Sequence, residues 1–176
     1  MKHITFILLL ATGSEIATAQ ILRTLSVDAT RDFEIEHEDS TISRSGPNGN
    51  ETFKIASNLM VENNDVHKEI HEIKFAKAER RGDTLSILIF ESHSALRHEY
   101  WIKIVKDRYM IDYRSLQAGE VKRKIKPEGF GLILNSSDLN TGKDLRGYTE
   151  YRGNCVKGCS RDKVVIIRGN FKVRIE

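Results

Sequence analysis

The feature that most restricts the fold of this chain is the repeated alternation of apolar and polar residues over short segments. In residues 100–105 and again in 109–113, apolar side chains occupy every second position, and the polar pair 106–107 separates the two segments. Because successive side chains of a strand point to opposite faces of a sheet, each segment predicts a half-buried strand, and the two predict a hairpin. Residues 85–90 are almost continuously apolar, which predicts a strand buried on both faces.

Further segments of this kind follow along the chain with turn residues between them. They cover residues 70–79, 85–90, 100–105, 109–113, 121–125, 131–134, 146–152, 164–168 and 171–175. The pair Gly169-Asn170 predicts a two-residue hairpin between the last two segments. Short strands at regular spacing predict an all-β fold, either an antiparallel β-sandwich or a partly closed barrel. Residues 51–61 fit one short helix, with a strand as the alternative.

The N-terminus has the order of a secretory signal. Within residues 1–19, Lys2 supplies a basic start, an apolar run follows, and Ala17-Thr18-Ala19 gives a small-x-small pattern before Gln20. This segment resembles the export signals of Gram-negative bacteria, and the resemblance implies a periplasmic or extracellular protein that begins at Gln20. A buried N-terminal strand or helix is the alternative.

The rest of the chain is expected to form one domain with a looser N-terminal part. Residues 20–50 predict a loosely structured segment or an edge strand, because Phe33, Ile35 and His37 alternate with charged residues. Residues 43–50 have the composition of a loop, and residues 51–176 predict the antiparallel β domain. Beyond residue 20 no apolar stretch reaches the roughly 18–20 residues that cross a bilayer, so no stable membrane span is expected.

Cys155 and Cys159 are the only cysteines of the chain. In an exported protein, an even pair of cysteines favours a disulfide, here one that would close a short loop between two strands. A zinc site needs two further ligands that the neighbouring sequence does not offer, and redox-active thiols usually have the closer spacing of a thioredoxin-like pair. Both remain alternatives.

The charge pattern does not point to a nucleic acid. The chain has 28 Lys and Arg against 25 Asp and Glu, a net charge of +3, so the total charge says little about partners. An acidic segment at 28–39 and a basic stretch at 103–126 are expected to be solvated faces that partly neutralise each other. An inhibitor or immunity-like protein that presents the acidic segment to a basic partner is one alternative.

Two groups of residues are candidates for a metal ion. Asp138, Asn140 and Asp144 offer oxygen ligands in an order similar to a calcium loop, although turn chemistry alone explains these residue types. His67 and His71 would share one face of a helix, but on a strand they are too far apart for one ion and are expected to be exposed polar residues. Apart from calcium, no cofactor is expected.

The aromatic residues of the basic stretch are the candidates for ligand binding. They are Tyr100, Trp101, Tyr109 and Tyr113. Side chains that alternate aromatic rings with Lys and Arg can hold a polymer by stacking and charge, while core packing is the alternative for the tyrosines. The expected partner is a protein, a saccharide or a small hydrophobic ligand.

No catalytic motif is assembled in the sequence, so the catalytic residues are unknown. Glu91, His93 and His98 lie with serines around a turn, where a polar hairpin loop explains them without catalysis. We therefore expect an exported, non-enzymatic binding or interaction module. A small secreted hydrolase that uses Glu91, His93 and His98 is the other alternative.

Overall fold

The computed structural model describes residues 22–38, 40–46, 49–64, 69–92, 96–117, 124–157 and 163–176. The expected signal segment and its cleavage residues Ala17, Ala19 and Gln20 lie outside the described residues. None of the described residues forms a helix long and apolar enough to cross a membrane.

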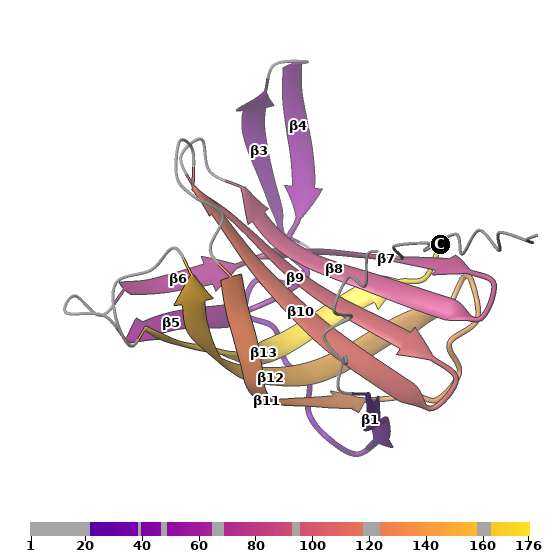
Figure 1. Ribbon diagram of the computed structural model, residues 1–176. Coiled ribbons are helices and arrows are strands. Elements are labelled where there is room, and N and C mark those ends of the chain that lie inside the picture. Colours follow the sequence, from indigo (N-terminus) through magenta and orange to yellow (C-terminus); the bar gives the residue numbers. More distant parts are fainter. Residues whose placement is uncertain are drawn as a thin grey trace, which may run out of the picture.

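The described residues form thirteen strands and no helix, as an all-β fold requires (Figure 1). The strands are β1 (Arg23–Thr24), β2 (Ser26–Val27), β3 (Thr41–Gly46), β4 (Gly49–Lys54), β5 (Leu59–Asn64), β6 (Glu69–Ile73), β7 (Phe75–Arg81), β8 (Thr84–Ser92), β9 (Leu96–Val105), β10 (Arg108–Gln117), β11 (Lys124–Leu134), β12 (Asp144–Lys157) and β13 (Val164–Arg174).

Two sheets pack face to face. The five-stranded sheet has the order β1-β10-β9-β8-β7, and the six-stranded sheet has the order β2-β11-β12-β13-β5-β6. Consecutive strands from β7 to β10 and from β11 to β13 pair antiparallel, because the turns between them are too short for a crossover. The predicted antiparallel architecture is therefore confirmed.

The two sheets are joined at both edges, which gives a sandwich that is partly closed into a barrel. At one edge, β6 continues into β7 with only Lys74 between them, and the bridge Ala78–Ile175 connects β7 to the end of the chain. At the other edge, β1 pairs with β10 and β2 pairs with β11, with only Leu25 between β1 and β2. Because one-residue connections join an edge strand of one sheet to an edge strand of the other, few sheet edges are left open.

The core lies between the sheets and follows the alternation seen in the sequence. Ile87, Ile102 and Ile167 are completely buried on the inward faces, while their sequence neighbours point outward. Gly147 allows the ring of Phe171 to approach β12, since a Cβ there would lie 2.5 Å from Phe171 Cζ. The inward positions of both sheets thus form one continuous apolar core.

Two local predictions are wrong. Residues 51–61 contain the end of β4 and the start of β5 in place of a helix, because Leu59 and Val61 alternate with Met60 into the core as a strand requires. Gly169-Asn170 is not a hairpin turn but an interior part of the continuous strand β13. At Gly169, with φ +154°, a Cβ would lie 2.6 Å from the carbonyl oxygen of Asn58, so glycine permits this close crossing.

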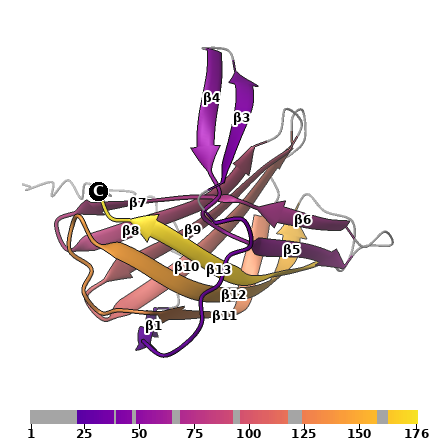
Figure 2. The ribbon, with the colours of Figure 1, turned by 180° about the vertical axis from the view of Figure 1, so that it is seen from behind.

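The N-terminal residues also differ from expectation. Residues 43–46 and 49–50, predicted as a loop, belong to the hairpin β3–β4, which projects from the two sheets (Figures 1 and 2). Residues 32–38, predicted as part of a loosely structured segment or an edge strand, cross the outward face of the six-stranded sheet without joining a ladder, so they are not an edge strand (Figure 2). Phe33 and Ile35 are buried there, so this segment is fixed by apolar contact and not by strand pairing.

Cys155 lies in β12, opposite Ile125 of β11. The part of the chain that the structure describes contains no free cysteine. Cys159 falls outside the described residues, so the pairing of Cys155 with Cys159 stays a prediction.

Candidate functional site

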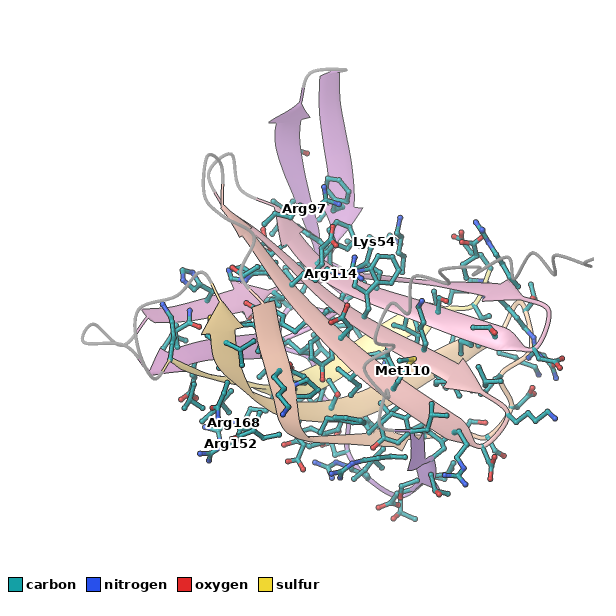
Figure 3. The ribbon with its side chains drawn as sticks, viewed as in Figure 1. Lys54, Arg97, Met110, Arg114, Arg152 and Arg168 are labelled. Atoms are coloured by element: carbon teal, nitrogen blue, oxygen red, sulfur yellow. The ribbon has the colours of Figure 1, made fainter. Side chains whose placement is uncertain are left out.

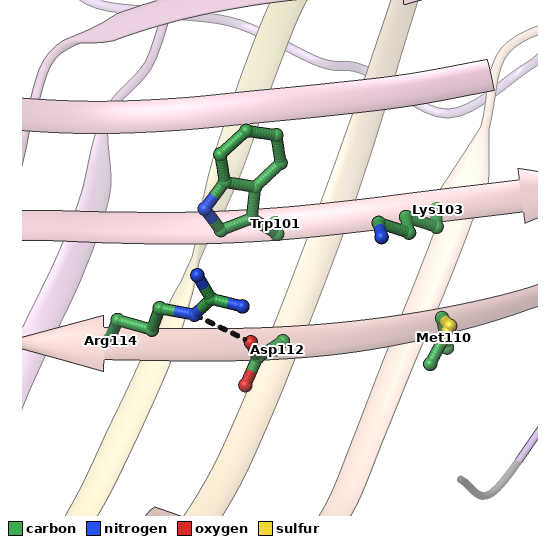
Figure 4. A pocket seen from close by; sticks show the side chains of 5 residues that line it. All are labelled: Trp101, Lys103, Met110, Asp112 and Arg114. Carbon is green, nitrogen blue, oxygen red and sulfur yellow. Dashed lines mark hydrogen bonds and ion pairs between the residues drawn. The ribbon is translucent and has the colours of Figure 1, made fainter. Parts of the chain in front are cut away.

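A shallow hollow centred on Trp101 lies on the outward face of the five-stranded sheet. Alternation along β9 and β10 sends its five lining residues outward while their neighbours enter the core. The register places Asp112 opposite Trp101 and Met110 opposite Lys103. The hollow has a volume of about 210 Å³ and is lined by Trp101, Lys103, Met110, Asp112 and Arg114 (Figure 4). We call it the Trp101 hollow.

The indole ring of Trp101 is held in place by a nearly buried carboxylate. Trp101 Nε1 donates to Glu99 Oε2 at 3.2 Å, and Arg97 Nη2 donates to Glu99 Oε1 at 2.6 Å. The Glu99 side chain is only 10% exposed, and each of its two oxygens accepts a hydrogen bond from a protein donor. The orientation of the ring is thus set before any ligand arrives, which lowers the entropy that a ligand would lose on binding.

Charged side chains surround the ring. Arg114 Nε donates to Asp112 Oδ2 at 2.9 Å. A guanidinium carries five N–H donors, so this bond leaves its terminal Nη groups available, and Figure 4 shows one of them directed toward Trp101. Lys103 has no carboxylate partner among the residues that the structure describes. The hollow therefore combines an aromatic face with donors and one acceptor.

The base of the β3–β4 hairpin borders this face. Phe53 of β4 contacts Phe75 and Phe90, with ring centroids 5.0 and 6.1 Å apart, and this packing anchors the hairpin on the five-stranded sheet. Lys54 follows Phe53, and Figure 3 shows Lys54, Arg97 and Arg114 close to where the hairpin meets the sheet. Three cationic side chains therefore lie on this side of the Trp101 hollow, two of them paired with the carboxylates of Glu99 and Asp112.

A second hollow lies on the outward face of the six-stranded sheet and has a volume of about 350 Å³. Its floor includes Gly129, and Arg152 and Arg168 stand beside it (Figure 3). Both arginines already bind acidic partners: Arg152 Nε lies 3.1 Å from Glu128 Oε2, and Arg168 Nη2 lies 3.1 Å from Glu62 Oε1. Arg152 and Arg168 are therefore neutralised within the protein, whereas Arg23, the third cation of this lining, lies over the ring of Phe130, 4.9 Å from its centroid.

Of the four aromatic residues predicted to bind a ligand, Trp101 alone faces outward. Tyr100, Tyr109 and Tyr113 are buried on the inward face of the five-stranded sheet, as the core-packing alternative requires. Tyr100 Oη and Thr149 Oγ1 are hydrogen-bonded at 2.7 Å across the core. Burial raises the pKa of the Tyr100 hydroxyl well above its usual value, so this group stays protonated in the folded protein.

Polar side chains also enter the core at the end away from the turns 82–83 and 106–107. Glu91, His98 and Ser115 lie opposite one another on β8, β9 and β10, and they are only 2%, 2% and 6% exposed. His98 Nδ1 and Tyr113 Oη are hydrogen-bonded at 2.7 Å. The interpretation of Glu91 and His98 as parts of a polar hairpin loop is therefore wrong, because both lie in strands and face the core; His93 falls outside the described residues.

The sequence offered a signal for this arrangement. His98 continues the alternation of Tyr100 and Ile102 toward the core, so its burial follows from the period of β9. His71 reaches the same cluster from the six-stranded sheet, with its ring centroid 5.1 Å from that of His98. The expectation that His71 is exposed is therefore wrong, and His67 lies outside the described residues.

The residues predicted to bind calcium do not converge. Asp138 Oδ1 accepts the backbone N–H of Asn140 and its side-chain Nδ2, at 3.3 and 2.7 Å, and these bonds lower the pKa of Asp138. Asp144 lies in β12 and faces Arg174 instead, at 3.5 Å. Across the described ranges, no three His, Cys, Asp or Glu residues are placed to hold a metal ion. Asp138 and Asn140 thus form a turn, and Asp144 is not part of it.

Within the described residues, the acidic segment is partly neutralised by cations of the six-stranded sheet and makes no ion pair with the described part of the basic stretch 103–126. Glu38 accepts hydrogen bonds from Arg146 Nη1 and Nη2 at 2.8 and 2.7 Å, and from Lys172 Nζ at 2.6 Å. Arg146 and Lys172 lie on the outward face of the six-stranded sheet, which this segment crosses. Expectation and structure differ because the N-terminal segment covers β12 and β13, not β9 and β10.

No family model matches this chain, and comparison with curated proteins and with solved structures found no match.

Proposed function

We propose that this protein is an exported, non-enzymatic binding module that holds a saccharide in the Trp101 hollow. One observation carries the proposal: a tryptophan ring, fixed through its N–H by Glu99, lies in an outward hollow among charged donors and acceptors. The C–H face of a sugar ring stacks on an aromatic face, while its hydroxyls need donors and acceptors at the edge. The Trp101 hollow offers both.

The chemistry of the lining favours a saccharide over a small hydrophobic ligand. Three of the five lining residues are charged, namely Lys103, Asp112 and Arg114. A purely apolar ligand would desolvate these groups without giving them hydrogen-bond partners, which costs free energy. Sugar hydroxyls donate and accept, so they replace the water that these side chains lose.

The remaining alternatives have weaker support. A hydrolase that uses Glu91 and His98 would require its substrate to reach side chains that are 2% exposed and face the core. An inhibitor that presents the acidic segment would have to compete with Arg146 and Lys172 for Glu38. The Trp101 hollow needs no rearrangement to admit a ligand.

The test uses the fact that Trp101 is the only tryptophan of the chain. Its intrinsic fluorescence reports on this one site, so titration with a panel of soluble neutral and acidic polysaccharides should change the emission for at least one of them. Affinity electrophoresis in the same polysaccharide should show retardation of the natural protein and of Tyr148→Ala, an aromatic change on the other sheet.

The variant Trp101→Ala should migrate without retardation in the same gel. Loss of retardation in Trp101→Ala with an unchanged melting temperature would support the proposal. Equal retardation of Trp101→Ala and the natural protein, or no response to any polysaccharide of the panel, would refute it.

A further inference from the structure

We infer that the saccharide held in the Trp101 hollow is acidic and carries a carboxylate on the sugar ring that stacks on Trp101. This inference rests on the proposed function. Two cationic side chains line the hollow, Lys103 and Arg114, against the single carboxylate of Asp112. The lining thus has an excess of positive charge, which an anionic group on the ligand would balance.

The free end of Arg114 is the main element of this recognition. Its Nε is occupied by Asp112, and this bond fixes the plane of the guanidinium on the sheet. One terminal nitrogen points toward Trp101, and the other points along β10 into the hollow (Figure 4). Guanidinium groups bind carboxylates through two parallel N–H bonds, so an acid group beside a stacked sugar ring fits this geometry.

Lys103 supplies the second cation. It lies two residues from Trp101 on the same face of β9 and opposite Met110 of β10. Lys103 is exposed and makes no ion pair with any residue in the described part of the chain. Because a lysine ammonium is a mobile point charge, it can follow the acid group from the side of the hollow opposite Arg114.

The position of Asp112 argues against a ligand of high charge density. Its carboxylate lies opposite Trp101, at the centre of the lining. A phosphate monoester in contact with it would bring close to two negative charges beside a like charge, whereas a sugar hydroxyl can donate to it. The arrangement therefore suits a ring with one carboxylate and several hydroxyls, which is the chemistry of a uronic acid.

The second hollow provides a contrast within the same molecule. Arg152 and Arg168 there bind Glu128 and Glu62, and Arg23, the third cation of that lining, lies over the ring of Phe130, 4.9 Å from its centroid. In the Trp101 hollow, Lys103 has no such partner to displace. The Trp101 hollow thus offers an anion one cation, Lys103, that is bound neither to a carboxylate nor to an aromatic ring of the described residues.

The experiment compares two ligands with the same sugar chain, one anionic and one neutral: trigalacturonate and its carboxyl methyl ester. Trp101 fluorescence is titrated with each, for the natural protein and for Arg114→Ala, Lys103→Ala and the control Lys77→Ala. Lys77 is an exposed cation on the same face, in β7 and outside the hollow. Short single-stranded DNA and a sulfated oligosaccharide are titrated as well, and the melting temperature of each variant is recorded.

We expect the acid form to bind at least about tenfold more tightly than the ester, as for hydrogen bonds to charged groups. Arg114→Ala and Lys103→Ala should remove most of this preference, whereas Lys77→Ala should retain it. Added salt should weaken binding of the acid more than binding of the ester.

Equal binding of acid and ester would overturn this inference and leave the saccharide proposal intact, while no response to either, nor to any polysaccharide of the panel, would overturn both. Tighter binding of the sulfated sugar or the DNA would overturn the assignment of a carboxylated ring. An equal loss of preference in Lys77→Ala would show a diffuse charge effect and would likewise overturn it.

Discussion

Replacement of Glu38 by glutamine is expected to destabilise the protein by about 1–2 kcal/mol. Glu38 accepts three charge-assisted bonds from Arg146 and Lys172, and each such bond contributes roughly 1.5–3 kcal/mol when shielded. The Arg146, Lys172 and Glu38 side chains are 35%, 25% and 21% exposed, so solvent screening reduces this sum. Glutamine also keeps neutral hydrogen bonds, which lowers the expected cost further.

The assay is thermal unfolding of Glu38→Gln beside Glu34→Gln, a change of the same type in the same segment. At neutral pH, Glu38→Gln should melt about 3–6 °C below the natural protein, on the usual scale for chains of this size. Glu34 makes no side-chain ion pair in the described part of the chain, so Glu34→Gln should melt within about 1 °C of the natural protein, as surface changes usually do.

The pH dependence of the difference follows from the pKa of Glu38. The hydrogen bond from Lys172 and the bonds from Arg146 hold this pKa below its ordinary value of 4.5. The stabilisation is therefore fully present above pH 4.5 and is lost as the pH falls through the lower folded value. Equal melting of Glu38→Gln and Glu34→Gln at neutral pH, or a difference that persists in strong acid, would refute the reasoning.

Three further predictions concern the core. Gly147→Ala should lower the free energy of unfolding by about 1–3 kcal/mol in denaturant, because the new Cβ would overlap the ring of Phe171. Gly129→Ala is the control and should be nearly neutral, since nothing lies within 4 Å of its Cβ position. Equal effects of the two changes would contradict the packing of β12. Thr149→Val should lower the free energy of unfolding by about 1–3 kcal/mol, because it leaves the buried Tyr100 hydroxyl without its hydrogen-bond partner. An unchanged unfolding midpoint would contradict that hydrogen bond. Burial raises the pKa of Tyr100 and of Tyr151. In an absorbance titration, these two tyrosines should therefore ionise only when alkali unfolds the protein. Ionisation of all the tyrosines before unfolding would contradict their burial.

Much of the fold can be predicted from the period of the sequence. The alternation in residues 100–105 and 109–113 gives both strands of the β9–β10 hairpin, and the pair 106–107 gives its turn. Prediction from the sequence fails where long-range contacts determine the local structure. Gly169-Asn170 has the local chemistry of a turn, but the crossing of Asn58 over Gly169 keeps β13 continuous. Phe33 and Ile35 alternate like a strand, yet they are buried in a segment that pairs with no neighbouring strand.

Part of the candidate site can also be predicted from the sequence. Counting outward from the two-residue turn 106–107 places Asp112 opposite Trp101 and Met110 opposite Lys103, as the structure has them. The same count separates Trp101 from Tyr100, since they point to opposite faces. Two contacts cannot be predicted from the sequence. The hydrogen bond of Trp101 with Glu99 depends on side-chain conformation, and the approach of His71 to His98 joins residues of two different sheets.

The most direct test of the account is to locate a bound saccharide on the protein. Amide and indole N–H resonances of the isotope-labelled protein are recorded during titration with an acidic oligosaccharide. The account predicts that the shifted signals gather on β9 and β10 around Trp101, with the Trp101 indole N–H among them. Shifts gathered around Gly129 and Arg152, or around Glu91 and His98 in the core, would contradict it.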